Sequence, residues 1–488
     1  MKKYVNLIVL MCLLATGCAK QGVVITIDVL NQPEVNRLIY SAPLSGTIYY
    51  GFSDTLKAKE TGKFELKLEL KQPSFIAIWD ERAQNRVKML VEPECNYHVS
   101  IDSTKNVQIA GSNEKGQMLY TTLPDPEYIE TESRKWFNYN DTVPVTSIHH
   151  QIDELKQSDL SKFKELLDDR EITKSFFDLV QKDRDCYYAL METRFLLLKA
   201  YESVRREIKI GDDLLQNLKE TYEQYPPNDE RLLFSSFWPQ YAGCFVKEYK
   251  QDFDIQKNRE LRNEGTYHTH IIHVSSKYLN GKAFEFFQAR YLWSECAEFG
   301  SMEKELISLF DQFEADYPKS EYSKYIRPFI EKIIDYYQVI EEPFDKDAVF
   351  IDNYETFNTL EEAIKPLLGK KIYIDVWATW CGPCKAEFAH NEALKKILAE
   401  NKIQQLYISI DKEDKDQQWK EMIKFYHLTG LHIRANKVLC DNLMDLYSKD
   451  EKERLIVIPW YMLVDEKGNI VDEHAKRPSQ LAAGEKLF

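Results

Sequence analysis

The stretch that decides the fold is Asp375-Val376-Trp377-Ala378-Thr379-Trp380-Cys381-Gly382-Pro383-Cys384-Lys385. It continues an apolar run from Lys371 to Trp377, which is typical of a buried strand. It leads into Cys384 to Glu400, whose spacing predicts an amphipathic helix. Two thiols separated by two residues at a strand-to-helix turn can close a small disulfide ring. Because the helix begins here, free backbone N–H groups and the positive end of the helix dipole would stabilise a thiolate at Cys381.

The C-x-x-C spacing also matches half of a zinc site. Zinc needs four ligands in a structural site, and the sequence holds no second C-x-x-C to complete the set. The pattern therefore favours redox chemistry with no metal and no other cofactor. We expect Cys381, as the more exposed sulfur, to attack a substrate disulfide. Cys384 lies one turn further into the helix and would resolve the mixed disulfide.

Strands and helices alternate through the last segment, residues 344–488. Further strands are predicted at Gln405–Ile410 and Trp460–Val464, and a helix at Trp419–Tyr426. The turn Asp465–Asn469 then leads into Ile470–Val471, which predicts a hairpin. A parallel pair of strands followed by a hairpin is an α/β arrangement.

Residues 18–112 have the alternating pattern of short strands. Lys63 to Leu70 alternates strictly and places Phe64, Leu66, Leu68 and Leu70 on one face. Turn residues separate the other candidates, which are Val23–Ile27, Gly46–Tyr50, Ser74–Trp79, Val87–Val91 and Tyr97–Ile101. The pattern predicts an antiparallel β-sandwich, in which we find no catalytic constellation.

Residues 113–343 change to the period of helices. Apolar residues recur at helical spacing over Leu160–Val180, Cys186–Ile208, Ala283–Phe299, Lys304–Phe313 and Tyr325–Tyr337. We therefore expect an α-helical domain that acts as a spacer or a recognition module.

The N-terminus has the layout of a secretory signal. Lys2 and Lys3 precede an apolar run from Tyr4 to Ala15, which is shorter than the ~20 residues of a spanning helix. Leu14-Ala15-Thr16-Gly17-Cys18 resembles a bacterial lipobox. That resemblance implies removal of residues 1–17 and a lipid on the Cys18 sulfur, which would anchor the chain to a membrane. An ordinary signal peptide with an incidental cysteine is the alternative.

Composition limits the classes of protein. Hydrophobic residues make up 44% and charged residues 29%, which suits a multidomain globular chain. The net charge of -15 disfavours nucleic acid as a partner. Five cysteines lie outside both the motif and the N-terminal segment, and we interpret most of them as buried thiols: Cys95, Cys186, Cys244, Cys296 and Cys440.

The quoted stretch resembles the active-site sequence of thioredoxins. More narrowly, it is similar to the TlpA/ResA-like thiol–disulfide oxidoreductases of bacterial envelopes, over residues 344–488. The resemblance implies a thioredoxin-like fold, protein disulfide substrates and a membrane electron donor. Residues 18–343 resemble, more weakly, the N-terminal parts of envelope lipoproteins that end in such a module, which implies architecture and no separate activity.

The resemblance also implies roles for residues near the cysteines. Asp375 matches the buried acid beneath the disulfide, which exchanges a proton with the resolving thiol; a strand-end cap is the alternative. Glu387 matches a glutamate proposed to tune the thiols, although an exposed helix glutamate would also explain it. Trp377 and Trp380 match flanking aromatics, for which packing is an alternative role.

Substrate contacts carry over in the same way. Trp380, Gly382 and Pro383 would form the rim of the site. Ile458-Pro459 matches the family's cis-proline, beside which backbone pairs with substrate like an added strand. One departure concerns the lysine that thioredoxins often place near the buried acid, because Gln405 to Asp411 contains none. Proton handling by Asp375 is therefore expected to differ.

Two other sequence patterns resemble metal-binding or cation-binding sites. His268, His270 and His273 form an H-x-H-x-x-H that could bind a metal, although no acidic or thiol partner is fixed nearby. The charge run Asp411–Asp416 is interpreted as a solvated helix start rather than a cation site.

The sequence as a whole predicts an envelope thiol–disulfide oxidoreductase that reduces protein disulfides. The implied tasks are keeping apocytochrome c thiols reduced or repairing misoxidised envelope proteins. Ala19 to Gly22 are not acidic, which favours a periplasm-facing position. An oxidase or isomerase is one alternative, and a partner-binding lipoprotein with a secondary redox pair is another.

Overall fold

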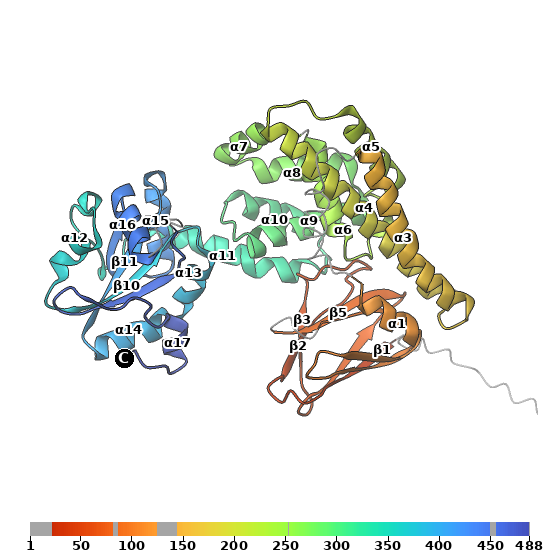
Figure 1. The fold of residues 1–488 in the computed structure, drawn as a ribbon, viewed down its shortest axis with the longest axis horizontal. Coiled ribbons are helices and arrows are strands. Elements are labelled where there is room, and N and C mark those ends of the chain that lie inside the picture. Colours follow the sequence, from red (N-terminus) through yellow and green to blue (C-terminus); the bar gives the residue numbers. More distant parts are fainter. Residues whose placement is uncertain (1–21, 82–85, 124–143, 252, 449–454, 488) are drawn as a thin grey trace, which may run out of the picture. The chain divides into compact units, whose positions relative to one another are not determined.

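A computed structural model describes residues 22–81, 86–123, 144–251, 253–448 and 455–487 (Figure 1). The predicted signal segment and the lipidation site Cys18 lie outside these ranges. Within them, every helix is too short or too polar to cross a membrane. The chain divides into two compact units, Met1–Ile330 and Glu331–Phe488, and the boundary falls inside α11 (Ser323–Glu341).

The first unit begins with two four-stranded sheets. One has the order β4-β1-β7-β8 and consists of β1 (Gly22–Val29), β4 (Lys63–Glu69), β7 (Asn96–Ile101) and β8 (Val107–Gly111). The other has the order β3-β2-β5-β6 and consists of β2 (Arg37–Ser41), β3 (Asp54–Lys57), β5 (Ser74–Asp80) and β6 (Val87–Val91). Both sheets contribute side chains to one apolar core, in which Ile25, Phe64 and Ile78 are buried.

The prediction of an antiparallel sandwich is wrong for one pair of strands. β1 runs parallel to β7, with Val24 opposite Asn96 and Val29 opposite Ile101. The predicted strand at Gly46–Tyr50 is also absent from this described stretch, which is a loop closed by the Leu44–Thr47 bridge. Alternation shows which side chains face a core but not which strand lies alongside, and this explains the error.

Helices make up the rest of the first unit. They are α1 (Glu114–Thr121), α3 (Val145–Asp168), α4 (Lys174–Arg205), α5 (Asp212–Gln224), α6 (Trp238–Lys247), α7 (Ile255–Glu264), α8 (Tyr267–Tyr278), α9 (Gly281–Trp293), α10 (Glu305–Asp316) and the start of α11. The helix predicted over Leu160–Val180 is interrupted between α3 and α4. The Thr173 hydroxyl accepts a hydrogen bond from Phe176 N–H and thereby caps α4.

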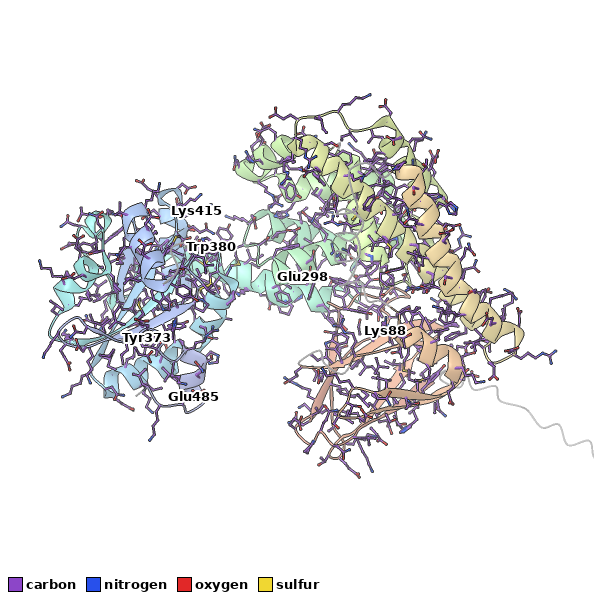
Figure 2. All side chains as sticks on the ribbon, in the orientation of Figure 1. Lys88, Glu298, Tyr373, Trp380, Lys415 and Glu485 are labelled. Atoms are coloured by element: carbon purple, nitrogen blue, oxygen red, sulfur yellow. A yellow bond between two sulfur atoms is a disulfide. The ribbon has the colours of Figure 1, made fainter. Side chains whose placement is uncertain are left out.

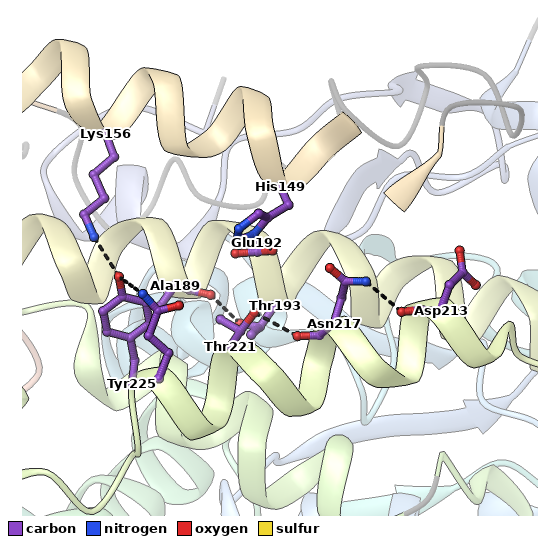
Figure 3. Close-up of polar contacts among 10 residues, drawn as sticks. His149, Lys156, Ala189, Glu192, Thr193, Asp213, Asn217, Thr221 and Tyr225 are labelled. Atoms are coloured by element: carbon purple, nitrogen blue, oxygen red, sulfur yellow. Dashed lines mark hydrogen bonds and ion pairs between the residues drawn. The ribbon is translucent and has the colours of Figure 1, made fainter. Parts of the chain in front are cut away.

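Polar contacts join α3, α4 and α5 along their length (Figure 3). His149 Nδ1 lies 2.7 Å from Glu192 Oε1, and the Lys156 ammonium donates to the Tyr225 hydroxyl at 2.8 Å. Burial raises the pKa of Glu192, and the neighbouring His149 opposes that rise. These contacts link the three helices to one another along their length.

An aromatic junction connects the first sheets to the helices within this unit. The Tyr49 and Trp293 rings meet edge to face at 5.4 Å, and Phe52 packs on Tyr322 at 5.3 Å. The Thr47 hydroxyl lies 2.7 Å from the Tyr322 hydroxyl. The loop once expected to be a strand therefore serves as a contact surface for helices. The division of this unit into domains at residue 112 stays a prediction.

The second unit is built on a six-stranded sheet of order β14-β13-β10-β11-β12-β9. Its strands are β9 (Ala348–Phe350), β10 (Lys371–Trp377), β11 (Ile403–Ser409), β12 (Gly430–Arg434), β13 (Trp460–Val464) and β14 (Ile470–Asp472). β10 runs parallel to β11 and antiparallel to β13, and β13 pairs with β14 in the expected hairpin. β10 and β13 have their predicted bounds.

Helices cover both faces of this sheet (Figure 1). α14 (Asn391–Glu400) and α17 (Pro478–Ala482) pack on one core, which includes Tyr373 and Tyr461. α12 (Leu360–Ile364), α15 (Asp416–Phe425) and α16 (Lys437–Tyr447) pack on the other. The helix predicted over Cys384–Glu400 is instead α13 (Gly382–Glu387), a single 3-10 turn at 388–390 and then α14.

A buried ion pair holds the interior of the first unit. Asp183 and Arg184 are 0% and 1% exposed, and an Arg184 guanidinium nitrogen lies 2.7 Å from Asp183 Oδ2. Tyr120 of α1 donates to the same carboxylate at 3.1 Å, and Ser235 donates to its other oxygen at 2.7 Å. The guanidinium also lies over the Tyr187 ring. α1 and α4 are thus tied together through one carboxylate.

Removing that carboxylate gives a test of the interior. Asp183→Ala leaves a buried guanidinium without its counter-charge, so the free energy of unfolding should fall by about 3–5 kcal/mol. Urea unfolding followed by far-UV circular dichroism measures the change. Tyr120→Phe removes one hydrogen bond only and should cost about 1 kcal/mol. Equal losses in the two variants would contradict the role given to the ion pair.

Candidate redox site

Cys381 and Cys384 form a disulfide at the turn between β10 and α13. Their Cα atoms are 5.3 Å apart. Cys381 is the N-cap of α13, and its sulfur accepts a hydrogen bond from Cys384 N–H at 3.1 Å. The free amide at the start of the helix therefore points at the sulfur, where it can stabilise negative charge.

The exposure of the two cysteines follows the expected order, but both residues are buried. Cys381 is the more exposed of the two, but it keeps only 4% of its surface, and Cys384 keeps none. Both cysteines are part of the core that α12, α15 and α16 cover. In the disulfide form, a partner would reach Cys381 only over the edge of this core.

Exposed side chains surround that edge. Trp380 is 66% exposed (labelled in Figure 2), and Gly382 and Pro383 are exposed as well. A side chain added at Gly382 would meet nothing within 4 Å among the described residues. Trp377, by contrast, is fully buried and packs edge-on against Phe388 at 5.2 Å, so its role is packing.

The Ile458–Pro459 bond is cis. Because Val376 pairs with Trp460 across the antiparallel β10–β13 ladder, Pro459 lies at the carboxyl end of β10, where the cysteine turn begins. Pro459 is buried, Ile458 is half-buried and Val457 is 55% exposed. The sheet thus brings the two segments to one edge.

Asp375 lies inside β10 and is fully buried. Among the described residues, neither of its carboxylate oxygens has a hydrogen-bond partner, so it does not act as a strand-end cap. Burial raises the pKa of Asp375 well above its ordinary value, and the negative charge of Glu387 raises it further. A carboxyl group in such a place holds its proton far above pH 4 and can return one to a thiolate.

Three tyrosines share the face of Asp375, and sequence reasoning missed them. Asp375 is paired with Tyr407 on β11 and with Tyr461 on β13, while Tyr373 precedes it by two residues on its own strand. Burial first, and then the charge of Asp375, raise the pKa values of Tyr407 and Tyr461. The alternation of residues along β10, β11 and β13 indicates which side chains share a face of each strand. Only the strand order shows that these side chains are neighbours.

Glu387 is not an exposed helix glutamate. It is 9% exposed, and its carboxylate accepts hydrogen bonds from Ser479 N–H at 2.9 Å and from the Ser479 hydroxyl at 3.0 Å. Ser479 lies in the first turn of α17, where an acceptor satisfies a free amide. Glu387 therefore anchors α17 to α13 and adds negative charge near Asp375.

The other sequence candidates are not assembled into sites. His268 Nδ1 lies 2.8 Å from the Tyr291 hydroxyl, and His270 Nε2 lies 2.9 Å from Gln251 Oε1. Within the described ranges, no group of three metal-ligating side chains comes together. The five scattered cysteines carry no disulfide in the described part of the chain. Burial raises the pKa of Cys296 to about 12 and that of Cys440 to about 11.

Comparison with known proteins agrees with this geometry. A family model described as Redoxin matches residues 359–483. The chain is 25% identical over 134 residues to the thioredoxin-like protein YneN of Bacillus subtilis, covering 27% of this chain and 72% of that protein. It is 26% identical over 111 residues to the sporulation thiol-disulfide oxidoreductase A of the same organism, covering 22% of this chain and 62% of that protein. The match therefore spans less than two thirds of this second relative.

One solved structure is similar in sequence to part of the chain. A Bacteroides vulgatus protein provisionally assigned as a thiol-disulfide oxidoreductase is 35% identical, with a TM-score of 0.21, and the likeness covers 25% of this chain and 75% of that one. The C-terminal region of the chain is thus a redoxin domain of the thioredoxin-like thiol–disulfide oxidoreductases. Membership of the narrower TlpA/ResA-like group stays a prediction from the sequence motif.

The buried acid predicts how stability depends on pH. The pKa of Asp375 is higher in the folded than in the unfolded chain, so folding retains a proton that unfolding releases. Its contribution is fully present below about pH 4 and is lost as the pH rises through the folded pKa. Oxidised Asp375→Asn should therefore be more stable than wild type at pH 8, by more than about 1 kcal/mol.

The gain should be smaller at pH 5, and urea unfolding followed by tryptophan fluorescence at both pH values measures it. Asp352→Asn serves as a matched control, because Asp352 is exposed in the same unit, and it should leave the pH dependence unchanged. A gain for Asp375→Asn that shrinks between pH 5 and pH 8 would contradict the raised pKa.

Proposed function

We propose that this chain is a cell-envelope enzyme that reduces protein disulfides through the Cys381/Cys384 dithiol. The observation that carries the proposal is the disulfide at the N-terminus of α13, directly after β10, the strand that contains the buried acid Asp375. A reversible dithiol needs a sulfur stabilised as thiolate and a nearby group that accepts the second proton, and these residues supply both.

The reaction proceeds in two exchanges. The Cys381 thiolate attacks one sulfur of a substrate disulfide, so a Cys381–substrate bond forms and the other substrate sulfur leaves as a thiolate. Cys384 then gives its proton to ionised Asp375, and its thiolate attacks the Cys381 sulfur. The mixed disulfide breaks and the Cys381–Cys384 disulfide forms. Two electrons pass from the dithiol to the substrate, whose thiolates take up protons.

Asp375 and Glu387 have separate tasks in this scheme. Asp375 accepts the Cys384 proton, because burial raises its pKa and so makes its carboxylate a stronger base than an ordinary one. Glu387 keeps that pKa high through its charge and fixes α13 against α17 through Ser479. In the opposite half of the cycle, protonated Asp375 returns a proton as the disulfide is reduced.

Substrate would lie along the exposed rim beside the disulfide. Trp380, Gly382 and Pro383 offer the exposed side of this rim, and the half-buried Ile458 and the buried cis Pro459 offer the other. The backbone beside Pro459 would then pair with an extended peptide like an added strand. An unfolded or flexible segment of a protein substrate fits such a surface.

The direction proposed is reduction. Gly-Pro between the cysteines is the thioredoxin sequence, whose potential is ~-270 mV, against ~-120 mV for the oxidant DsbA. A membrane dithiol donor of the envelope would return the two electrons to the Cys381–Cys384 disulfide. The substrate classes we propose are the disulfide of oxidised apocytochrome c, whose thiols are thereby kept reduced, and the disulfides of misoxidised envelope proteins.

We also propose that the residues before the thioredoxin-like domain anchor and position it. We propose that residues 1–17 are a signal peptide and that Cys18 carries a lipid anchor facing the periplasm. Residues 18–112 and 113–343 would then form the β and helical domains that hold the thioredoxin-like domain, residues 344–488, away from the membrane or against a partner. These assignments rest on the sequence patterns.

Trapping tests the mechanism. In Cys384→Ala the first exchange proceeds but the second cannot, so covalent complexes with substrate proteins should accumulate. Non-reducing electrophoresis of the full-length variant, expressed in a bacterial envelope, measures them. The double variant Cys381→Ser/Cys384→Ala is the matched control and should trap nothing.

Insulin reduction with dithiothreitol gives the second readout. Wild type should accelerate precipitation of the insulin chains, and Cys381→Ser should give the uncatalysed rate. Equal rates for the two proteins would favour a binding lipoprotein with a secondary redox pair. A measured potential well above about -200 mV would favour an oxidase or isomerase.

A further inference from the structure

Asp411 lies two residues beyond the end of β11 and is buried, in contrast to its neighbours. The sequence run Asp411–Asp416 was expected to be solvated, and Lys412, Glu413 and Asp414 are indeed exposed. Asp411 itself is 1% exposed. A carboxylate in that position is costly unless donors surround it.

The donors come from the cysteine turn and from the end of β11. Thr379 N–H donates to Asp411 Oδ2 at 2.9 Å, and the Thr379 hydroxyl donates to Oδ1 at 2.8 Å. The Ser409 hydroxyl donates to Oδ2 at 2.8 Å, while Asp411 N–H donates back to Ser409 Oγ at 3.1 Å. Both carboxylate oxygens of Asp411 therefore accept hydrogen bonds. Asp411 binds Thr379 through both the backbone N–H and the side-chain hydroxyl of Thr379.

Thr379 is the second residue of the turn, residues 378–381, that ends at Cys381. Cys381 N–H donates to the Ala378 carbonyl at 3.0 Å, which closes the turn over residues 378–381. Thr379 is 3% exposed, whereas the next residue, Trp380, is 66% exposed. The turn is thus held at Thr379 on one side and by the start of α13 on the other.

The strand ends explain why these residues meet. Trp377 pairs with Ser409 in the parallel β10–β11 ladder, and Ile410 N–H donates to the Trp377 carbonyl at 2.9 Å. The chain leaves both strands at the same edge of the sheet, so a residue just past β11 can reach a residue just past β10. The contact therefore follows from the register of the two strands.

We propose that Asp411 is a positioning residue of the redox site, holding the turn through Thr379 so that the Cys381 sulfur stays against the Cys384 amide. The inference rests on the proposed function for its importance to catalysis, but not for its geometry. Cys381 Sγ accepts from Cys384 N–H at 3.1 Å only while the turn keeps its shape. A loosened turn would withdraw the sulfur from the helix start and weaken the thiolate.

Alkylation of the reduced full-length chain tests this directly. The rate at which iodoacetamide modifies Cys381, followed by mass spectrometry of its peptide, rises with pH as the thiolate forms. In Asp411→Ala the midpoint of that rise should move up toward about 8.5, the value of an ordinary cysteine. At neutral pH the rate should fall about ten-fold if the wild-type midpoint is near 7, as in thioredoxin-type sites.

Three further variants separate positioning from charge and from stability. An asparagine at 411 can accept from Thr379 N–H and Ser409 with its oxygen and donate to the Thr379 hydroxyl with its amide, so Asp411→Asn should keep the wild-type midpoint. Thr379→Val loses one of the two contacts and should shift the midpoint by less than Asp411→Ala. Ser409→Ala leaves both contacts with Thr379 in place and should stay near wild type.

An unchanged midpoint in folded Asp411→Ala overturns the inference, and so does an equal upward shift in Asp411→Asn, because that variant keeps the contacts with Thr379. If Asp411→Ala fails to fold, Thr379→Val decides by the same criterion, with the unfolding midpoint of the oxidised protein as its stability control. Alkylation of Cys381 does not require the chain to reduce any substrate. A wild-type chain that is inactive on insulin would therefore refute the proposed function and leave this inference standing.

Discussion

The pairing of β10 between β11 and β13 is the constraint on which the redox site depends. It sets Asp375 between Tyr407 and Tyr461, and it brings three chain segments to the carboxyl edge of β10. These segments are the cysteine turn, the cis Pro459 and the stretch after β11 that contains Asp411. A slip by one residue would send Asp375 to the opposite face of the sheet and separate it from the tyrosines.

The same pairing explains why the site contains groups that do not favour stability. A buried carboxyl without a hydrogen-bond partner is costly, and the protein tolerates it at Asp375 because burial is what raises its pKa. Asp411 is also a buried acid, but both oxygens of its carboxylate accept hydrogen bonds. Among the described residues, one buried acid has no hydrogen-bond partner and the other is fully bonded, which is why we propose a chemical role for Asp375 and a positioning role for Asp411.

The interior of the first unit is held by contacts of a different kind. Its interior depends on one ion pair, Asp183–Arg184, and on aromatic contacts between a loop of the sheet region and the helices. The described residues of this unit carry no disulfide and no cluster of metal ligands. Within the described ranges, the disulfide Cys381–Cys384 lies in the second unit, which is the part that resembles known oxidoreductases.

The sequence by itself determined the identity of the chemistry. The C-x-x-C at a strand-to-helix turn, the bounds of β10 and β13, and the proline beside β13 were all readable, because local spacing and alternation are properties of a single segment. Asp375 was recognisable as a candidate acid for the same reason. The aromatic neighbours Trp377 and Trp380 were recognised too, but only the structure distinguished the buried one from the exposed one.

Only the tertiary structure decided which residues surround the disulfide. Tyr407, Tyr461, Ser479 and Asp411 come from separate segments, and their approach to the site follows from strand order and helix packing rather than from any local pattern. The parallel pairing of β1 with β7 was missed for the same reason. An alternating strand shows which face it buries, whereas its neighbour is chosen by contacts that the whole chain must close.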